Sequence, residues 1–434
     1  YKRQAHSKCG NKFSKFRATV KIHKTPDWAT KKQPLRFRPI VACCGTWLNC
    51  WSKWLDYYLQ MLTPFVPTYA GGVQPILDWL ITITGLPPWA RLFTSDADAM
   101  YNNIDTIHAI KVISEWLDNL SLHPKFPPNY PLAAIKSAMK TIMKNNHFEF
   151  GDLNFLQLLG TAMGTSAACM WATIYYGTHE AKTLIPTYKH QLKDGKMIRW
   201  IDDIFGCWVC DICKKECCIH WTNFVASLPY GKLTWTTAKP SKSVVFLDMC
   251  LTIEKGRVTT RTYQKPMNLY LYIPPTSNHP PRQTNAIIYQ ILKKYKSQNT
   301  HHSDYLKYAI LLYRRFRARG HQPSTLRKSF LAAHFKLSSS ANLENQPILT
   351  STGELRQSFL HCQFNAPDPP GRALMRLHTK HCQDFQEELG LLPPKICYSR
   401  PKNIGDVATQ TRLHQNPAKT ASHFMGEFQK GLDP

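Results

Sequence analysis

The chain has 434 residues, 43% of them hydrophobic, and a formal net charge of +27, which exclude wholesale disorder and indicate a folded protein with a polyanionic partner, most simply nucleic acid. Its longest apolar stretch is interrupted by an aspartate, two prolines and an arginine, so it falls short of the roughly 18 to 20 residues of a membrane helix. With no secretory signal, we expect an intracellular, nuclear protein whose 14 cysteines are reduced thiols.

The N-terminal segment is basic and is predicted to form two strands. Residues 16–26, which contain Lys21, alternate enough for one strand, and residues 35–42 form the second. Arg38 and the arginine two positions before it share one face, and Pro39 restricts this strand to the edge of a sheet. Such a face either contacts phosphate or is simply solvated. Because the chain begins with Tyr rather than Met, we also expect it to be part of a longer protein.

Hydrophobic periodicity predicts the next elements. Apolar spacing indicates a helix within 46–65 that ends before Pro64, a second within 74–86 that Gly85 stops, and a third over 132–144. The Gly-Asp centre of residues 147–158 is typical of a β-hairpin. Residues 159–180 then run from a turn with two glycines into a helix that is dense in small residues. Those glycines allow a backbone or a ligand to approach closely.

A first candidate acid lies at the end of a strand predicted to start at Leu92. Asp96 ends this strand, and Asp105 or Thr106 caps the helix that follows. An acid in this position is either an active-site carboxylate or a structural cap, and its own surroundings in the sequence do not decide between them.

Two adjacent acids form the second candidate. Residues 197–209 read as two short buried strands with Asp202 and Asp203 at the tip of their hairpin. At about 4 Å and an effective dielectric constant of about 20, two negative charges repel by about 4 kcal/mol. The tip is therefore either fully solvated or neutralised by a cation such as a divalent metal ion.

Four cysteines that follow match an iron–sulfur spacing. They are Cys207, Cys210, Cys213 and Cys217. Cys207 falls in the buried strand, no proline follows the fourth cysteine, and residues 211–228 read as one amphipathic helix that would scatter the thiols. We therefore expect free thiols here rather than an iron–sulfur or zinc site.

The C-terminal part is helical and basic after a hairpin at 243–266. Residues 282–328 carry 11 Lys and Arg against Asp304 alone, with tyrosines between the charges. This composition suits a duplex backbone, although a solvated helical face has the same pattern. The basic residues expected to contact primer and template are Lys293, Lys294, Arg314 and Arg315. Residues 336–355 are serine-rich and are expected to be a linker.

The chain resembles reverse transcriptases of Penelope-like retroelements, which are akin to telomerase, and the matching stretches follow the order of that family. The matching stretches are KIHKTP (21–26), RPIVA (38–42), SDADAMYNNI (95–104), Q-x2-GTAMGT (157–165), WIDDIF (200–205), FLD (246–248), Y-x-KP (263–266), SNHP (277–280) and, more weakly, YSRPKNIGD (398–406). The resemblance implies an α+β right-hand polymerase. Its parts would be fingers (1–90), an antiparallel-sheet palm (91–266, with 121–158 partly an insertion into the fingers), a basic helical thumb (267–335), and a linker with a C-terminal extension of unknown role (336–434).

The resemblance also implies an activity and a site. RNA-directed DNA synthesis would proceed from dNTPs at a primer 3′-hydroxyl with two Mg2+ or Mn2+ ions, on an RNA template paired with a DNA primer. Asp96, Asp202 and the main-chain carbonyl of Ala97 would hold the metals, with Asp203 as the second acid nearer the primer. The nucleotide would contact Lys21, Arg38, Tyr101, Gln157, Met163 and Gly164. The primer and template would contact Phe246, Leu247, Asp248 and Lys265.

Tyr101 falls where this family keeps an aromatic steric gate that excludes a ribose 2′-hydroxyl, which implies DNA rather than RNA synthesis. Three positions depart from the family: Trp200 replaces a tyrosine, Cys169 a proline and Ala97 a valine. None of them removes a metal ligand. An RNA-dependent RNA polymerase, an intron maturase and an inert nucleic-acid-binding relic of a transposon remain alternatives. The family's GIY-YIG nuclease motif is absent before Pro434, so the chain is either truncated or of an endonuclease-lacking branch.

Overall fold

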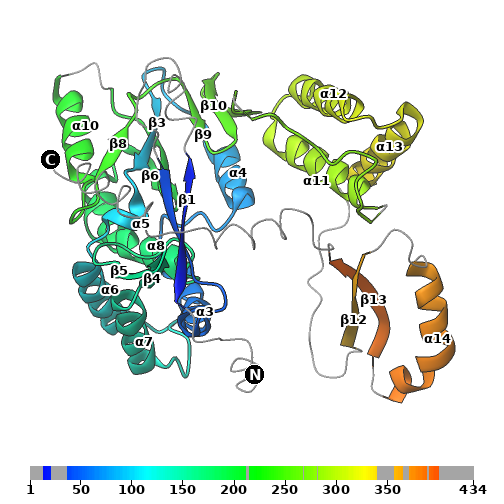
Figure 1. Ribbon diagram of the computed structural model, residues 1–434. Coiled ribbons are helices and arrows are strands. Elements are labelled where there is room, and N and C mark those ends of the chain that lie inside the picture. Colours follow the sequence, from blue (N-terminus) through cyan, green and yellow to red (C-terminus); the bar gives the residue numbers. More distant parts are fainter. Residues whose placement is uncertain are drawn as a thin grey trace. The chain divides into compact units, whose positions relative to one another are not determined.

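The computed structural model describes residues 13–20, 37–211, 215–266, 268–280, 282–339, 356–364, 371–388 and 391–399. These residues divide into two compact units, one that ends before residue 267 and one that begins at residue 268 (Figure 1). Lys21, the KIHKTP stretch, Cys213 and most of the predicted linker lie outside the described residues. Among the described residues, no helix is both long enough and apolar enough to cross a membrane.

The first unit begins with a four-stranded sheet, which we call the N-terminal sheet. Its strands are β1 (Ser14–Val20), β2 (Phe37–Ala42), β4 (His147–Phe150) and β5 (Leu153–Leu156). The order is β2-β1-β4-β5, so β2 lies at the edge, as Pro39 in its sequence predicted. The predicted hairpin at 147–158 is confirmed, and it joins the basic strands because β4 pairs in parallel with β1.

A second four-stranded sheet, which we call the central sheet, carries the predicted acids. Its strands are β6 (Leu192–Trp200), β7 (Asp203–Trp208), β3 (Arg91–Ala97) and β8 (Trp235–Thr237), in the order β6-β7-β3-β8. Every pairing in it is antiparallel, which confirms the predicted antiparallel sheet. Successive side chains on β7 alternate between two apolar clusters, so both faces of this sheet are covered.

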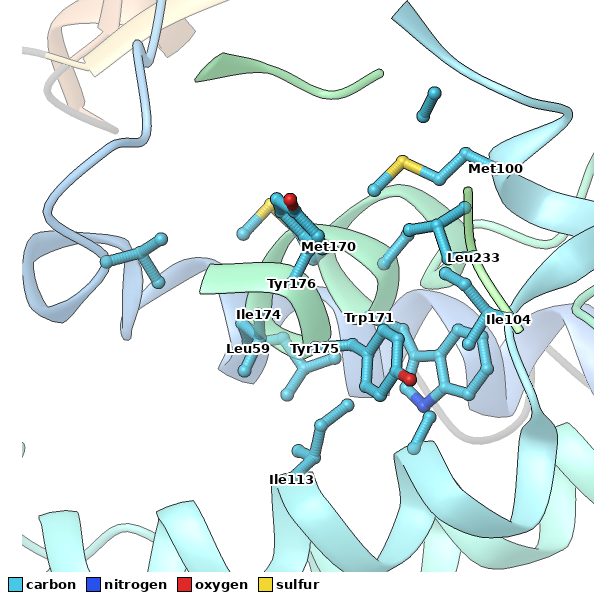
Figure 2. Packing of buried hydrophobic residues seen from close by; sticks show 14 of the residues in the cluster. Leu59, Met100, Ile104, Ile113, Met170, Trp171, Ile174, Tyr175, Tyr176 and Leu233 are labelled. Atoms are coloured by element: carbon cyan, nitrogen blue, oxygen red, sulfur yellow. The ribbon is translucent and has the colours of Figure 1, made fainter. Parts of the chain in front are cut away.

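Helices cover one face of the central sheet. At the centre is α8 (Ala168–His179), in which nearly every residue is buried, because the small residues predicted there allow close packing on all sides. The residues around it include Leu59, Met100, Ile104 and Ile113 (Figure 2). Apart from α4 (Val73–Thr82), the other described helical segments of this unit are α3 (Trp47–Gln60), η2 (Thr63–Phe65), α5 (Met100–Asn103), α6 (Thr106–Leu120), α7 (Leu132–Lys144), the π-helix η3 (Glu180–Leu184), α9 (Ile185–Tyr188) and α10 (Lys215–Ser227). Asp105 caps α6, as predicted, by accepting from two backbone amides.

The opposite face packs against α4 (Val73–Thr82) and a small sheet. This sheet has the order β11-β10-β9, from β9 (Ser243–Phe246), β10 (Met249–Glu254) and β11 (Arg257–Thr262). The predicted turn between β10 and β11 is confirmed, with Lys255 and Gly256 both at positive φ. The Phe205 ring of the central sheet lies 5.3 Å from the Phe246 ring of β9.

The second unit contains the basic helices. They are α11 (Gln283–Gln298), α12 (His302–Ala318) and α13 (Pro323–Ser339), whose apolar sides share one core, as the interleaved aromatic residues predicted. The linker was predicted to start at 336, but α13 continues to Ser339, because Ala333 and Leu337 are buried in that core. Residues beyond it include β12 (Arg356–Gln363), α14 (Gly371–Glu388) and β13 (Leu391–Ser399), with the two strands parallel. No pattern in the sequence predicted this βαβ unit.

The described residues leave out Cys213, and among them no group of three or more His, Cys, Asp or Glu side chains could hold a metal ion. Cys207 is buried in β7 as predicted, and burial raises the pKa of its thiol to about 12. The expectation of reduced thiols is wrong at Cys210, which is disulfide-bonded. Ten other described cysteines, Cys207 among them, form no disulfide.

Candidate active site

The central sheet places two of the predicted acids directly opposite each other. Asp96, near the end of β3, is in register with Asp203, the first residue of β7. Directly opposed residues of an antiparallel pair point to the same face, with Cα atoms roughly 4.5 to 5.5 Å apart. The period of two places both side chains on the face that packs against β9, and both are half-buried. The pairing register of β3 and β7 thus brings together two acids that lie 107 positions apart in the sequence.

The turn between β6 and β7 holds the third acid. Trp200 pairs with Asp203, so Ile201 and Asp202 form a two-residue turn. Ile201 has φ of +54° and Asp202 is not in the left-handed region, which is the sign pattern of a type II′ turn. That turn usually has Gly in its first central position, and a β-branched residue there costs roughly 1 to 3 kcal/mol. The hairpin tip therefore stores strain beside the acids.

The backbone ties this turn to the neighbouring strand. The Ala97 amide donates to the Asp202 carbonyl oxygen at 2.8 Å. Ala97 itself is buried, so only its backbone is available to the site. The bond keeps the end of β3 and the hairpin tip together, and the three acids consequently gather at one end of the central sheet.

The donor set at this end suits a hard divalent cation. No three acids form a complete metal cage by themselves among the described residues. Mg2+, however, is usually bound through one or two carboxylates together with substrate phosphates and water, not by an all-protein cage. Two opposed carboxylates from different strands fit that mode of binding.

A fully buried ion pair lies behind the hairpin tip. The Arg199 side chain points to the helical face of the sheet, where Nε and Nη2 donate to the two carboxylate oxygens of Glu180, each at 2.8 Å. Both side chains are 0% exposed. Nη2 also donates to the Thr173 carbonyl oxygen (2.8 Å), and Nη1 donates to the Ile201 carbonyl oxygen (3.0 Å). The guanidinium group therefore reaches from the helices to the turn that carries Asp202.

The FLD stretch forms a second hairpin tip of the same kind. Met249 pairs with Phe246, Leu247 has φ of +55°, and the Asp248 carbonyl oxygen accepts from the Tyr263 amide at 2.7 Å. Phe246 is only 2% exposed, so its ring packs in the core instead of facing a nucleic acid. Leu247 and Asp248, both half-buried, are the parts of this stretch that reach the surface.

The glycine loop packs directly on the turn that holds Tyr101. The Thr161 amide donates to the Tyr101 carbonyl oxygen at 2.7 Å, and the Gly160 amide donates to that of Ile104 at 2.9 Å. A Cβ on Gly160 would lie 2.1 Å from the Tyr101 carbonyl oxygen. With φ of +76°, this position requires glycine for both its conformation and its space.

The other end of the same loop packs on β2. The Val41 amide donates to the Met163 carbonyl oxygen at 3.0 Å, and a Cβ on Gly164 would lie 2.3 Å from the Val41 carbonyl oxygen. Arg38 is exposed on this strand. The loop thus links Arg38, Met163, Gly164 and Tyr101, four of the residues predicted to contact a nucleotide. Gln157, at the start of the loop, is half-buried and donates through Nε2 to the Leu159 carbonyl oxygen.

Tyr101 lies in the neighbourhood of Asp202 and Cys169. Burial raises the pKa of the Tyr101 hydroxyl well above its usual range, and Cys169, which is hydrogen-bonded to it, and the Asp202 carboxylate both raise it further. The hydroxyl is therefore neutral at physiological pH. The Cys169 thiol is thus a hydrogen-bonding partner of this hydroxyl, which a proline side chain at this position would not provide.

Asp98 is a site neighbour that the sequence interpretation missed. Its two carboxylate oxygens accept from the hydroxyls of Thr234 and Thr236, each at 3.1 Å. The Asp98 amide donates to the Thr234 carbonyl oxygen at 3.0 Å. This acid links the end of β3 to the β8 edge, and each of its carboxylate oxygens accepts from a hydroxyl, so we regard it as structural.

The basic residues predicted to contact primer and template are spread over both units. Lys265, Lys293, Lys294 and Arg314 are exposed. Arg315 is half-buried, with its guanidinium carbon 3.8 Å from the centre of the Tyr270 ring. Arg315 thus packs within the second unit, and the others present charge to solvent.

Comparison with known proteins gives a weak structural likeness to polymerases. No family model and no curated protein sequence matches the chain. An apo telomerase from Candida tropicalis has 12% sequence identity, covers 57% of this chain and 55% of its own, and has a TM-score of 0.40. Telomerase from Candida albicans with a fragment of telomeric RNA has 10% identity, 65% and 51% coverage and a TM-score of 0.43. The BmCPV RNA-dependent RNA polymerase at quiescent state has 12% identity, 60% and 23% coverage and a TM-score of 0.40.

The chain spans about half the length of these telomerase chains and about a quarter of the viral polymerase. At scores of this size the likeness does not assign an activity. The chemistry of this chain therefore has to be inferred from its own residues.

Proposed function

We propose that this chain is a template-directed nucleic acid polymerase and, more narrowly, an RNA-directed DNA polymerase of the Penelope-like retroelement type. The observation that carries the proposal is the register of β3 and β7, which sets Asp96 opposite Asp203 at the end of an antiparallel sheet. Asp202 lies in the adjoining turn, and a tightly packed glycine loop holds Tyr101 and the β2 strand nearby. These parts match the needs of nucleotidyl transfer from a dNTP to a primer 3′-hydroxyl.

Asp96, Asp202 and Asp203 would hold two Mg2+ or Mn2+ ions together with the triphosphate. When bound, such ions lower the pKa of the primer hydroxyl and neutralise the leaving pyrophosphate. The chain's own contribution is positioning, because the β3–β7 register and the Ala97 to Asp202 bond fix the carboxylates before substrate arrives. The exposed Arg38 on β2 would bind the triphosphate, and the Gln157 to Gly164 segment would border the base pair.

In this proposal the N-terminal sheet belongs to the fingers, the central sheet is the palm and the basic helices α11 to α13 form the thumb. The thumb would bind an RNA–DNA hybrid through its phosphates, which is sequence-independent. The first test is therefore the salt dependence of binding. For a B-form duplex, each neutralised phosphate contributes roughly 0.9 to the slope of log affinity against log salt.

Lys293→Ala and Arg314→Ala should each reduce the size of this slope by roughly 0.9, the contribution of one phosphate, without a change of template preference. Lys111→Ala, on the exposed side of α6, is the matched control and should leave the slope unchanged. Fluorescence anisotropy of a labelled primer–template over a salt series measures this. A slope near zero for the wild-type chain would contradict a phosphate-binding thumb.

The second test is sugar selection by Tyr101. Tyr101→Ala should reduce the preference for deoxynucleotides by roughly 10- to 200-fold, the range that one missing steric contact in a pocket supplies. Tyr101→Phe keeps the ring and loses only the hydroxyl beside Cys169, so it should retain the preference. Tyr57→Ala, an exposed tyrosine on α3, is the control. Single-nucleotide extension with dNTPs and rNTPs gives the ratio of kcat/KM values.

An unchanged ratio in Tyr101→Ala would refute the gate. If the wild-type chain itself prefers ribonucleotides, the activity is that of an RNA polymerase and the narrower proposal fails.

A further inference from the structure

Stability alone does not require the buried pair of Arg199 and Glu180 to be charged. A buried ion pair replaced by well-packed apolar residues is often as stable or more stable, so such a pair is weak support for a role in stability alone. This pair is completely buried and lies on the face of the central sheet opposite Asp96 and Asp203. What distinguishes this pair from a purely structural one is the hydrogen bond that Nη1 of Arg199 donates to the Ile201 carbonyl oxygen.

That carbonyl belongs to the strained residue of the hairpin tip. Ile201 adopts φ of +54°, which persists only where surrounding contacts impose it. The next carbonyl, that of Asp202, is held from the other side by the Ala97 amide. Two consecutive carbonyl oxygens of the turn are therefore fixed by donors from different elements, one of them a side chain that the helices hold rigidly.

The anchor at the helical end is equally specific. Glu180 takes two bonds from Arg199 and a third from the Thr68 hydroxyl, and it is the first residue of the π-helix η3. Segments of π-helix are rare and often occur at functional sites. The backbone of Arg199 also bonds to the segment that contains Thr68, since its amide donates to the Thr68 carbonyl oxygen at 2.7 Å.

We propose that Arg199 is a positioning residue, which holds the Ile201–Asp202 turn in its strained shape so that Asp202 and Asp203 are presented at the end of the sheet. Glu180 orients the guanidinium group for this purpose. The role deepens the proposed polymerase function and rests on it for its effect on catalysis. Its effect on the shape of the turn is independent of any activity.

The test compares three variants of the full chain. Arg199→Lys keeps the charge beside Glu180, but one ammonium group cannot reproduce the fork that joins Glu180 to Ile201. The double variant R199M/E180M removes both charges and keeps an apolar core. Arg91→Lys is the matched control, because Arg91 also donates from the central sheet to backbone carbonyls, those of Pro88 and Ala90, at the start of β3.

Two readouts separate positioning from folding. In Arg199→Lys and in the double variant, kcat for primer extension should fall by roughly 10- to 100-fold, as for other residues that orient metal ligands, with KM little changed. Hydrogen exchange of peptides spanning 199–205 should become faster, whereas exchange in α8 stays slow. Thermal unfolding of the double variant should stay close to that of the wild type. The control should match the wild type in every readout.

Full activity and unchanged exchange at 199–205 in the folded double variant would overturn the proposal. A loss of activity that only tracks the loss of folded protein would also overturn it, because that is the signature of a purely structural pair. If the wild-type chain extends no primer, the proposed function has failed, and the exchange measurement still decides whether Arg199 holds the turn.

Discussion

Asp96→Asn and Asp203→Asn should each abolish primer extension while the chain remains folded. Asn has nearly the same shape as Asp and lacks the negative charge, so the loss reports the charge at the end of the sheet. Metal-assisted stabilisation of a transition state is worth several kcal/mol, and about 4 kcal/mol corresponds to roughly 10³-fold in rate. The expected result is therefore a fall in kcat of at least that size, measured by single-turnover extension with saturating primer–template and dNTP.

The matched control is Asp98→Asn, on the same segment and two residues beyond Asp96. Its carboxylate bonds to Thr234 and Thr236 and does not oppose another acid, so its removal should cost less than about tenfold in kcat and slightly weaken the β8 edge. Circular dichroism and thermal unfolding verify the fold of all three variants. Substantial extension by Asp203→Asn, or an equal loss in Asp98→Asn, would contradict the assigned roles.

Gly160→Ala and Gly164→Ala should destabilise the chain and disrupt the nucleotide side of the site. A Cβ at Gly160 would overlap the Tyr101 carbonyl oxygen at 2.1 Å, and one at Gly164 would overlap the Val41 carbonyl oxygen at 2.3 Å. Overpacking of this kind typically costs about 1 to 3 kcal/mol, in addition to about 1 kcal/mol or more for Ala at positive φ. Urea denaturation should report the sum as a lower free energy of unfolding.

The chain supplies two controls for the conformational contribution. Gly151 and Gly45 have φ of +63° and +83°, and a Cβ at either would meet nothing within 4 Å. Gly151→Ala and Gly45→Ala should therefore show the conformational cost alone. The excess loss in Gly160→Ala and Gly164→Ala isolates the contact with the Tyr101 and Val41 backbones.

The polymerase activity of the two loop variants should differ from that of the two controls in the same way. A displacement of about 1 Å at a substrate-positioning group can cost roughly 10²-fold in rate, so the two loop variants should lose kcat/KM for dNTPs well beyond their loss of folded protein. Equal stability and activity in all four alanine variants would show that the loop does not hold Tyr101 and β2 in place.

Much of the framework was predictable because local patterns set it. Helical periodicity predicted α3, α6 and α7, and the sequence also indicated Asp105 as an N-cap. Alternation around the paired acids located the β6–β7 hairpin, and Pro39 indicated an edge strand, as observed. Each of these features depends on residues within about ten positions of one another, so the sequence contains the information directly.

The register between distant strands could not be predicted in this way. The sequence suggested that Asp96 and the Asp202–Asp203 pair meet, but not that Asp203 is the one opposite Asp96 while Asp202 occupies a strained turn. On β6, the neighbouring Trp200 and Arg199 side chains point to opposite faces of the sheet. Trp200, unexplained from sequence, is partly buried and packs against the apolar cluster that contains Phe205 and Phe246.

Arg199 and Glu180 were overlooked because neither belongs to a short motif. A lone arginine within an apolar strand was a usable signal, since an unpaired charge is almost never fully buried. Its partner lies 19 residues earlier on a helix, at a distance that no local pattern specifies.

Primer extension by the wild-type chain on an RNA template, with Mg2+ and all dNTPs, tests the central claim most directly. The expected product is DNA whose sequence is the complement of the template, absent when Asp203 is replaced by Asn. A folded wild-type chain that binds the primer–template but adds no nucleotide to it, with Mg2+ or Mn2+, would contradict the assignment of Asp96, Asp202 and Asp203 as the catalytic acids of a polymerase.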